Sequence, residues 1–145
     1  MQRRSLGRGR RLAAVGAGLM VIACILPWWL VGGTPGITAE SGNGLAGSGI
    51  LVFLVGIAAL ALLALPFAAG DRPVGLDRWL SFAILAIVGW IGFAWRVIDL
   101  ARLGALQFSA PAQLLTNGPG LWLAGIGLVI LARAAYLISQ EPGHR

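Results

Sequence analysis

The stretch that decides the expected fold is Trp79–Leu103, WLSFAILAIVGWIGFAWRVIDLARL. It is apolar over a length that can cross a bilayer, which takes about twenty helical residues. Near its end it carries Arg96, Asp99 and Arg102 at three-residue spacing. That spacing places the three charged side chains close together on one face of a helix. The stretch therefore predicts a membrane-spanning helix with a polar site near one end.

The composition of the whole chain supports a membrane protein. Its 145 residues are 58% hydrophobic and 11% charged, and their mean hydropathy is +0.85. A soluble domain of this size has too high a surface-to-volume ratio to bury so much apolar surface. The length suits a single domain, so we expect one membrane domain over residues 1–145.

Four apolar stretches are long enough to be membrane spans, and short polar segments separate them. The predicted spans cover residues 12–31, 49–69, 79–100 and 119–138. The other segments are a basic tail (1–11), two outer loops (32–48 and 101–118) and an inner loop (70–78). No segment indicates a β-strand. We therefore expect an all-α, polytopic membrane protein, a bundle of four transmembrane helices with short loops.

The two outer loops differ in their expected structure. Residues 32–48 are so rich in glycine that we expect a flexible, turn-rich loop. In the second loop, Ser109 and Pro111 form a plausible helix start and Asn117-Gly118 a plausible stop, which predicts a short interfacial helix. Both loops end in Asn-Gly, so two related hairpins are conceivable; whether they are a true repeat stays open.

The arginines predict how the chain is threaded. With the N-terminus inside, nine of the eleven basic residues fall on the cytoplasmic side, and only Arg96 and Arg102 fall outside. This bias is the positive-inside pattern of multi-pass proteins. Both termini are then cytoplasmic. The size and the four-span plan are typical of small bacterial membrane proteins, so we expect the bacterial cell (inner) membrane.

Two further sets of residues are expected to hold the spans in place. Small residues permit close packing between helices, and the candidates are Gly56, Gly89, Gly92, Gly120, Ala124 and Gly127. Aromatic residues at span ends suit the headgroup level, and the predicted interfacial anchors are Trp28, Trp29, Trp79, Trp122 and Tyr136. Arg133 lies deeper in its span, and we expect its side chain to extend toward the cytoplasm.

The spans lack the side chains that catalysis or metal binding would need. His144, the one histidine, lies in a polar tail, and Cys24 is the one cysteine. A histidine-based triad, a metal centre or a thiol oxidoreductase needs more than these two residues. We therefore expect no enzyme activity, no catalytic or metal-binding residue and no cofactor. The arginines flank the spans as membrane insertion requires, so nucleic acid is not an expected partner.

Cys24 leaves one alternative for the first span. Val21–Cys24 fits the loose pattern of a lipoprotein cleavage site. A lipoprotein cysteine should be followed by a polar tether, whereas here the apolar run continues to Val31. We therefore expect an uncleaved chain with Cys24 as a small buried residue.

Arg96 and Asp99 leave two interpretations open. One is an ion pair near the helix end that sets depth and packing. The other is a polar functional site at the mouth of the bundle. The sequence favours a small non-catalytic multi-pass protein that acts through helix packing, in a homo-oligomer or a larger membrane complex within the lipid bilayer. The alternative is a small oligomeric transporter or channel subunit with its polar site at Arg96 and Asp99.

Overall fold

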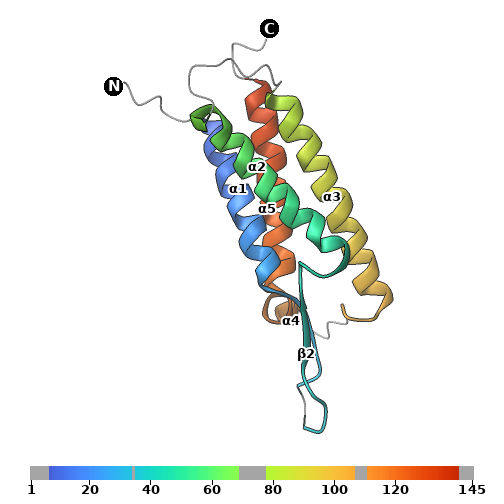
Figure 1. Cartoon of the computed structure of the whole chain (residues 1–145). Coiled ribbons are helices and arrows are strands. Elements are labelled where there is room, and N and C mark those ends of the chain that lie inside the picture. Colours follow the sequence, from blue (N-terminus) through green and yellow to red (C-terminus); the bar gives the residue numbers. More distant parts are fainter. Residues whose placement is uncertain (1–6, 34, 69–77, 107–110, 141–145) are drawn as a thin grey trace.

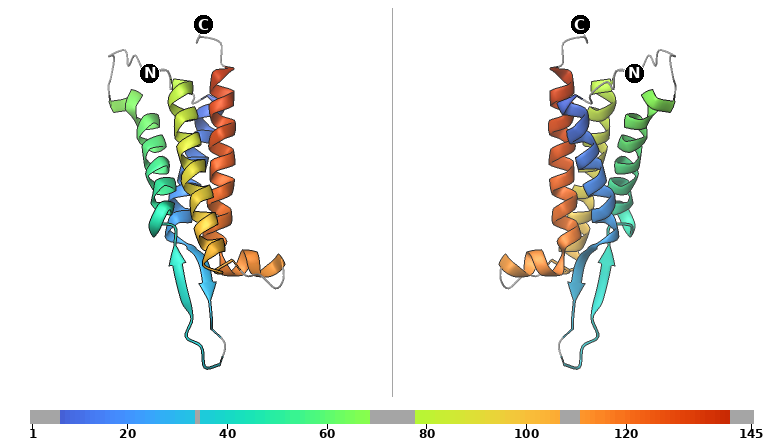
Figure 2. Two further views of the ribbon diagram at one scale, coloured as in Figure 1. Left: turned by 90° about the vertical axis from the view of Figure 1, so that its right-hand side faces the viewer. Right: turned by 90° about the vertical axis from the view of Figure 1, so that its left-hand side faces the viewer.

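The chain is mostly helical. The computed structural model describes residues 7–33, 35–68, 78–106 and 111–140. Four long helices lie side by side (Figure 1): α1 (Arg8–Ile25), α2 (Ile50–Ala68), α3 (Arg78–Arg102) and α5 (Pro119–Ser139). A short helix, α4 (Pro111–Asn117), extends sideways at one end (Figure 2). The predicted all-α class is confirmed, with the exception of one hairpin described below.

Each long helix packs against two others in the ring order α1, α5, α3, α2, and the contact between α1 and α5 is the most extensive. One end of the bundle carries α4 and a β-hairpin (Figure 1). At this end α1 and α3 finish, and α2 and α5 start. We call this the hairpin end. Within the described residues the core is apolar, and no polar or charged residue is buried.

Three helices are long and apolar enough to cross a membrane. They cover Gly47–Ala68, Trp79–Arg102 and Pro119–Ser139. Their bounds lie within two residues of three predicted spans, 49–69, 79–100 and 119–138. The largely apolar runs explain this agreement, because each has the length of a bilayer crossing with few charged residues and ends in polar residues or glycine. The predicted short helix in the second outer loop is also confirmed, as α4.

The first predicted span, 12–31, needs a correction. α1 has 18 residues, begins earlier than predicted and includes three arginines in its first turn, so it is not among the three apolar helices. It also ends at Ile25 rather than Val31. Pro27 is the cause, because proline has no N–H for a helical hydrogen bond and disfavours helical geometry in the residue before it. Leu26 accordingly has extended backbone angles, with φ −73° and ψ 156°.

A β-hairpin replaces the expected end of that span and part of the expected flexible loop. β1 (Pro27–Val31) pairs antiparallel with β2 (Glu40–Asn43), with Trp29 opposite Gly42. The hairpin extends beyond the helices (Figure 1). The prediction that the chain has no strand is therefore wrong. After β2, a 3₁₀ turn, η1 (Gly47–Gly49), leads directly into α2.

Two predicted segments fall largely outside the described residues. They are the inner loop over 70–78, of which the structure describes only the last residue, and the first six residues of the basic tail. The rest of that tail belongs to the first turn of α1.

Candidate functional site

Trp28 closes the hairpin end of the bundle. Its indole N–H donates a hydrogen bond of 2.9 Å to the carbonyl oxygen of Ala23. Pro27 cannot supply the helical N–H for that oxygen, so the indole takes its place. The next free carbonyl of α1, that of Cys24, accepts a 3.0 Å hydrogen bond from the backbone N–H of Gly44. The end of α1 is thus capped by the hairpin and the residue after it.

The same side chain holds several elements together. Trp28 is fully buried, and its ring meets that of Phe93 on α3 edge-on, with the ring centroids 5.9 Å apart. A Cβ added to Gly44 or Gly120 would come within 2.7 Å of the Trp28 ring. These glycines therefore leave the space that the indole fills. Trp28 differs from its expected role as an interfacial anchor, since an anchor must reach the headgroups.

Arg96 lies where α3 packs against η1 and the start of α2. An added Cβ at Gly92, one turn earlier, would lie 2.6 Å from Leu51 Cβ and 3.3 Å from the carbonyl oxygen of Ser48. The guanidinium of Arg96 reaches Gly47, where an added Cβ would lie 2.9 Å from Nη1. Gly47 also has a φ of +63°, which favours glycine. The guanidinium therefore lies against η1, the turn that leads into α2.

The structure does not bring the three predicted charged residues into ion pairs. Within the described part of the chain, Arg96, Asp99 and Arg102 make no ion pair with one another. Arg102 is exposed, whereas Arg96 and Asp99 are partly buried. The guanidinium of Arg96 turns toward η1 instead of toward the carboxylate one turn further along α3.

Three buried polar atoms at the hairpin end have no hydrogen-bond partner among the described residues. They are Trp29 Nε1, Ser48 Oγ and Arg96 Nε. An unsatisfied buried donor costs about 1–3 kcal/mol, so such groups call for an explanation. Ser48 and Arg96 belong to elements that face each other. The sequence drew attention to Arg96, but a serine within a glycine-rich loop carries no signal of its own.

The predicted small residues lie at contacts between helices. A Cβ added to any of the five predicted glycines would come within 3.0 Å of an atom on another helix: Gly56, Gly89, Gly92, Gly120 and Gly127. Ala124 is fully buried. The matching surface on α1 was not predicted from the sequence. There Gly16 lies against Gly127, since a Cβ on either glycine would lie 2.9 Å from the carbonyl oxygen of the other.

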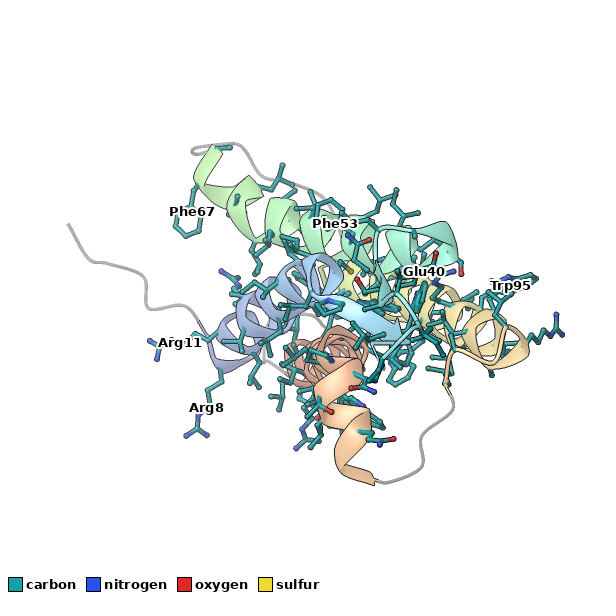
Figure 3. The ribbon with its side chains drawn as sticks, turned by 90° about the horizontal axis from the view of Figure 1, so that it is seen from below. Arg8, Arg11, Glu40, Phe53, Phe67 and Trp95 are labelled. Atoms are coloured by element: carbon teal, nitrogen blue, oxygen red, sulfur yellow. The ribbon has the colours of Figure 1, made fainter. Side chains whose placement is uncertain are left out.

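Aromatic residues lie near both ends of the bundle. At the end opposite the hairpin, Trp79 and Tyr136 line one shallow groove of about 300 Å³ between α3 and α5. The Arg133 guanidinium lies 5.6 Å from the centre of the Tyr136 ring, so the arginine extends toward that end, as predicted. Near the hairpin end, Trp122 is exposed on α5. Trp95 on α3 was not predicted as an anchor, yet 63% of its surface is exposed and it points outward (Figure 3).

Two larger apolar grooves open between neighbouring helices. One, of about 570 Å³, lies between α3 and α5 and is lined by Trp90, Phe93 and Trp122 among others. The other, of about 450 Å³, lies between α2 and α3. Both views in Figure 2 show α2 leaning away from the other helices toward the end opposite the hairpin. The small residues Ala58, Ala61 and Ser81 line this second groove with leucine and isoleucine side chains.

The described residues contain no group of three or more His, Cys, Asp or Glu side chains that could hold a metal ion. Cys24 is buried in α1. Comparison with protein-family models, curated protein sequences and solved structures finds no match to this chain.

Proposed function

We propose that α1 crosses the membrane together with the three apolar helices, which makes the chain a four-span protein. The support is the length of its contact with α5. A Cβ added to Gly9 would lie 2.7 Å from Ile138, near the end of α5. A Cβ added to Gly120, at the start of α5, would lie 2.5 Å from the Ala23 carbonyl oxygen. A helix that stays beside α5 over this distance shares its depth in the bilayer.

The arginines of α1 are compatible with this placement. Its 18 residues make a helix of about 27 Å, close to the roughly 30 Å of a hydrocarbon core. Arg8 and Arg11 are exposed and point away from the bundle (Figure 3). Such side chains can reach the headgroups while the rest of the helix stays in lipid. The positive-inside bias supports a bacterial inner membrane protein with cytoplasmic termini and the hairpin end outside.

Within this topology the protein acts through helix packing and not through catalysis, with a second copy or with another membrane protein. The groove between α2 and α3 carries this proposal. In the most apolar 18 residues of α2 and of α3, only 22% of the stretch is buried inside the structure, whereas the corresponding share in α5 is 44%. The groove also exposes small side chains, which permit close approach of another transmembrane helix.

Site-specific crosslinking tests this proposal. A diazirine-bearing amino acid at Ala61, inside the groove, should crosslink to protein in native membranes, and the same residue at Ala94 is the matched control. Both alanines are exposed, but only Ala61 lines the groove. The crosslinked product formed at Ala61 should disappear when the substitution Ala58→Leu fills the groove. The mass of that product distinguishes a homodimer from a complex with another protein. Lipid adducts alone at both positions would refute the proposal.

A transporter or channel subunit is the second candidate, and the unpartnered guanidinium of Arg96 favours it. Against it, the described part of the bundle buries no polar or charged residue, so a polar path would have to form between copies. Ion flux in vesicles containing the purified protein separates the candidates, since only the transporter predicts a flux that Arg96→Gln abolishes.

A further inference from the structure

The starting observation is a groove that follows the contact between α3 and α5. Its part toward the end opposite the hairpin has about 300 Å³ and is lined by Trp79 and Tyr136 among others. Its part nearer the hairpin has about 570 Å³. Trp90 lines both parts, so they adjoin each other. At about 1.5 Å per residue, Trp79 and Trp90 lie about 17 Å apart along α3. This is roughly half the thickness of a hydrocarbon core, the depth that one acyl chain covers in one leaflet.

The lining of this groove suits an apolar chain. Besides aromatic rings, it consists mainly of alanine and isoleucine side chains in the smaller part and of valine, leucine and isoleucine in the larger part. Ile87 and Val129, which belong to this lining, are exposed. Both α3 and α5 are long and apolar enough to cross a membrane. In a bilayer the groove therefore opens toward lipid tails.

The third observation is a cation beside the groove. The guanidinium of Arg133 lies 5.6 Å from the centre of the Tyr136 ring, and the side chain is exposed. The ring offers a favourable contact but no acceptor for the five N–H donors of the arginine. With the described residues Arg133 makes no hydrogen bond or ion pair. The described carboxylates, Glu40 in β2 and Asp99 near the end of α3, lie toward the hairpin end and not near Arg133.

The depth of Arg133 identifies the kind of acceptor. Arg133 lies about 9 Å before the end of α5 at Ser139, and its side chain extends toward that end. This brings the guanidinium to the border between hydrocarbon and headgroups, the level that Trp79 and Tyr136 also suit. An arginine at this level keeps its charge and needs an anion. The anions that lie directly above an acyl chain are the phosphates of phospholipids.

We propose that the groove between α3 and α5 binds one anionic phospholipid in the leaflet at the end opposite the hairpin. One acyl chain lies in the groove between Trp79 and Trp90. Arg133 binds the phosphate, because its planar pair of donors matches two phosphate oxygens. Basic sites between transmembrane helices bind anionic headgroups in the same way. The proposal requires only that α3 and α5 lie in the membrane, and it is independent of any partner at the groove between α2 and α3.

The first test measures lipid binding to the purified full-length chain by native mass spectrometry. Phosphatidylglycerol should be retained more strongly than phosphatidylcholine, whose choline cation offsets the charge of the phosphate. Arg133→Gln should weaken phosphatidylglycerol binding about tenfold or more, the usual effect of losing hydrogen bonds to a charged group. Arg133→Lys should fall between the two, because it keeps the charge without the planar donor pair. Arg11→Gln is the matched control, because Arg11 is an exposed cation at the same end that points away from the bundle (Figure 3).

The second test concerns the acyl chain. Ala83 lines the smaller part of the groove, so Ala83→Leu should narrow it and weaken the binding of both lipids. Ala94→Leu adds the same side chain at an exposed position of α3 outside both parts of the groove, and it should leave binding unchanged. This pair leaves Arg133 intact, so it remains informative if Arg133→Gln does not fold. Thermal melting shows which variants are folded.

Each unexpected outcome overturns a stated part of the proposal. Equal binding by the wild type and Arg133→Gln, or equal losses in Arg133→Gln and Arg11→Gln, would refute the phosphate contact. Equal retention of the two lipids would refute an anionic ligand. Displacement of phosphatidylglycerol by excess glycerol phosphate, the headgroup without its chains, would assign the site to a soluble phosphate compound. Unchanged binding in Ala83→Leu would refute the position of the chain.

Discussion

The contact between Gly16 of α1 and Gly127 of α5 supports the sharpest prediction about stability. In Gly16→Ala, the new Cβ would lie 2.9 Å from the Gly127 carbonyl oxygen and 3.0 Å from the Leu131 backbone nitrogen. Both are backbone atoms of a helix, so neither can move aside alone. The two helices must separate slightly, and this loosens the contact on both sides of the crossing.

The size of the effect follows from two opposing terms. Alanine favours a helix by about 1 kcal/mol relative to glycine. Overpacking a close contact costs about 1–3 kcal/mol. Gly16→Ala should therefore lower the free energy of unfolding by up to about 2 kcal/mol. Gly18 on the same helix meets no atom within 4 Å of an added Cβ, so Gly18→Ala should keep only the favourable term.

The assay compares the two variants by unfolding in mixed micelles, with helix content followed by circular dichroism. Gly16→Ala should unfold at a lower fraction of denaturing detergent than the wild type, and Gly18→Ala should not. The difference between the two variants, about 1–3 kcal/mol, isolates the α1–α5 contact because the helix propensity terms cancel. Equal stability of the two variants would refute the close packing of α1 on α5.

Two more predictions concern the hairpin end. Trp28→Phe should lower the free energy of unfolding by about 1–3 kcal/mol, because the Ala23 carbonyl loses its donor; in the same assay Trp95→Phe, at an exposed position, should have little effect, and equal losses would contradict the capping role. In a Cys24→Ala background, a membrane-impermeant thiol reagent should label a cysteine introduced at Ser41 in intact cells but not one at Ser139; labelling of Ser139→Cys would overturn the threading.

The three apolar helices could be predicted from the sequence because their signals are local. Each is a largely apolar stretch of membrane-spanning length, and α4 begins at a proline and ends at the Asn of an Asn-Gly pair. The predicted end of the first span was wrong because hydropathy takes no account of backbone hydrogen bonding and backbone angles. Residues 26–31 are apolar enough to be the end of a membrane-spanning helix. However, Pro27 removes one helical hydrogen bond and favours an extended backbone at Leu26.

The hairpin could not be inferred in the same way, because its stability depends on distant segments. An isolated two-stranded hairpin is at best marginally stable in water. Here the hairpin contains the buried Trp28, and the Gly44 N–H caps the last turn of α1. Gly120, from the start of α5, completes the space for the indole. No local pattern in residues 27–43 indicates that a glycine so far along the chain makes room for Trp28.

Arg96 shows the same limit for a charged side chain. Residues three apart on a helix are neighbours, so the spacing of Arg96 and Asp99 permits an ion pair but does not require one. The direction of the guanidinium depends on what lies beside α3. Gly92 lets η1 approach closely, and Gly47 has no side chain to exclude Nη1, so the arginine turns toward η1, just before α2. Two glycines, one of them in a different segment, therefore decide that Arg96 faces the turn before α2 and not Asp99.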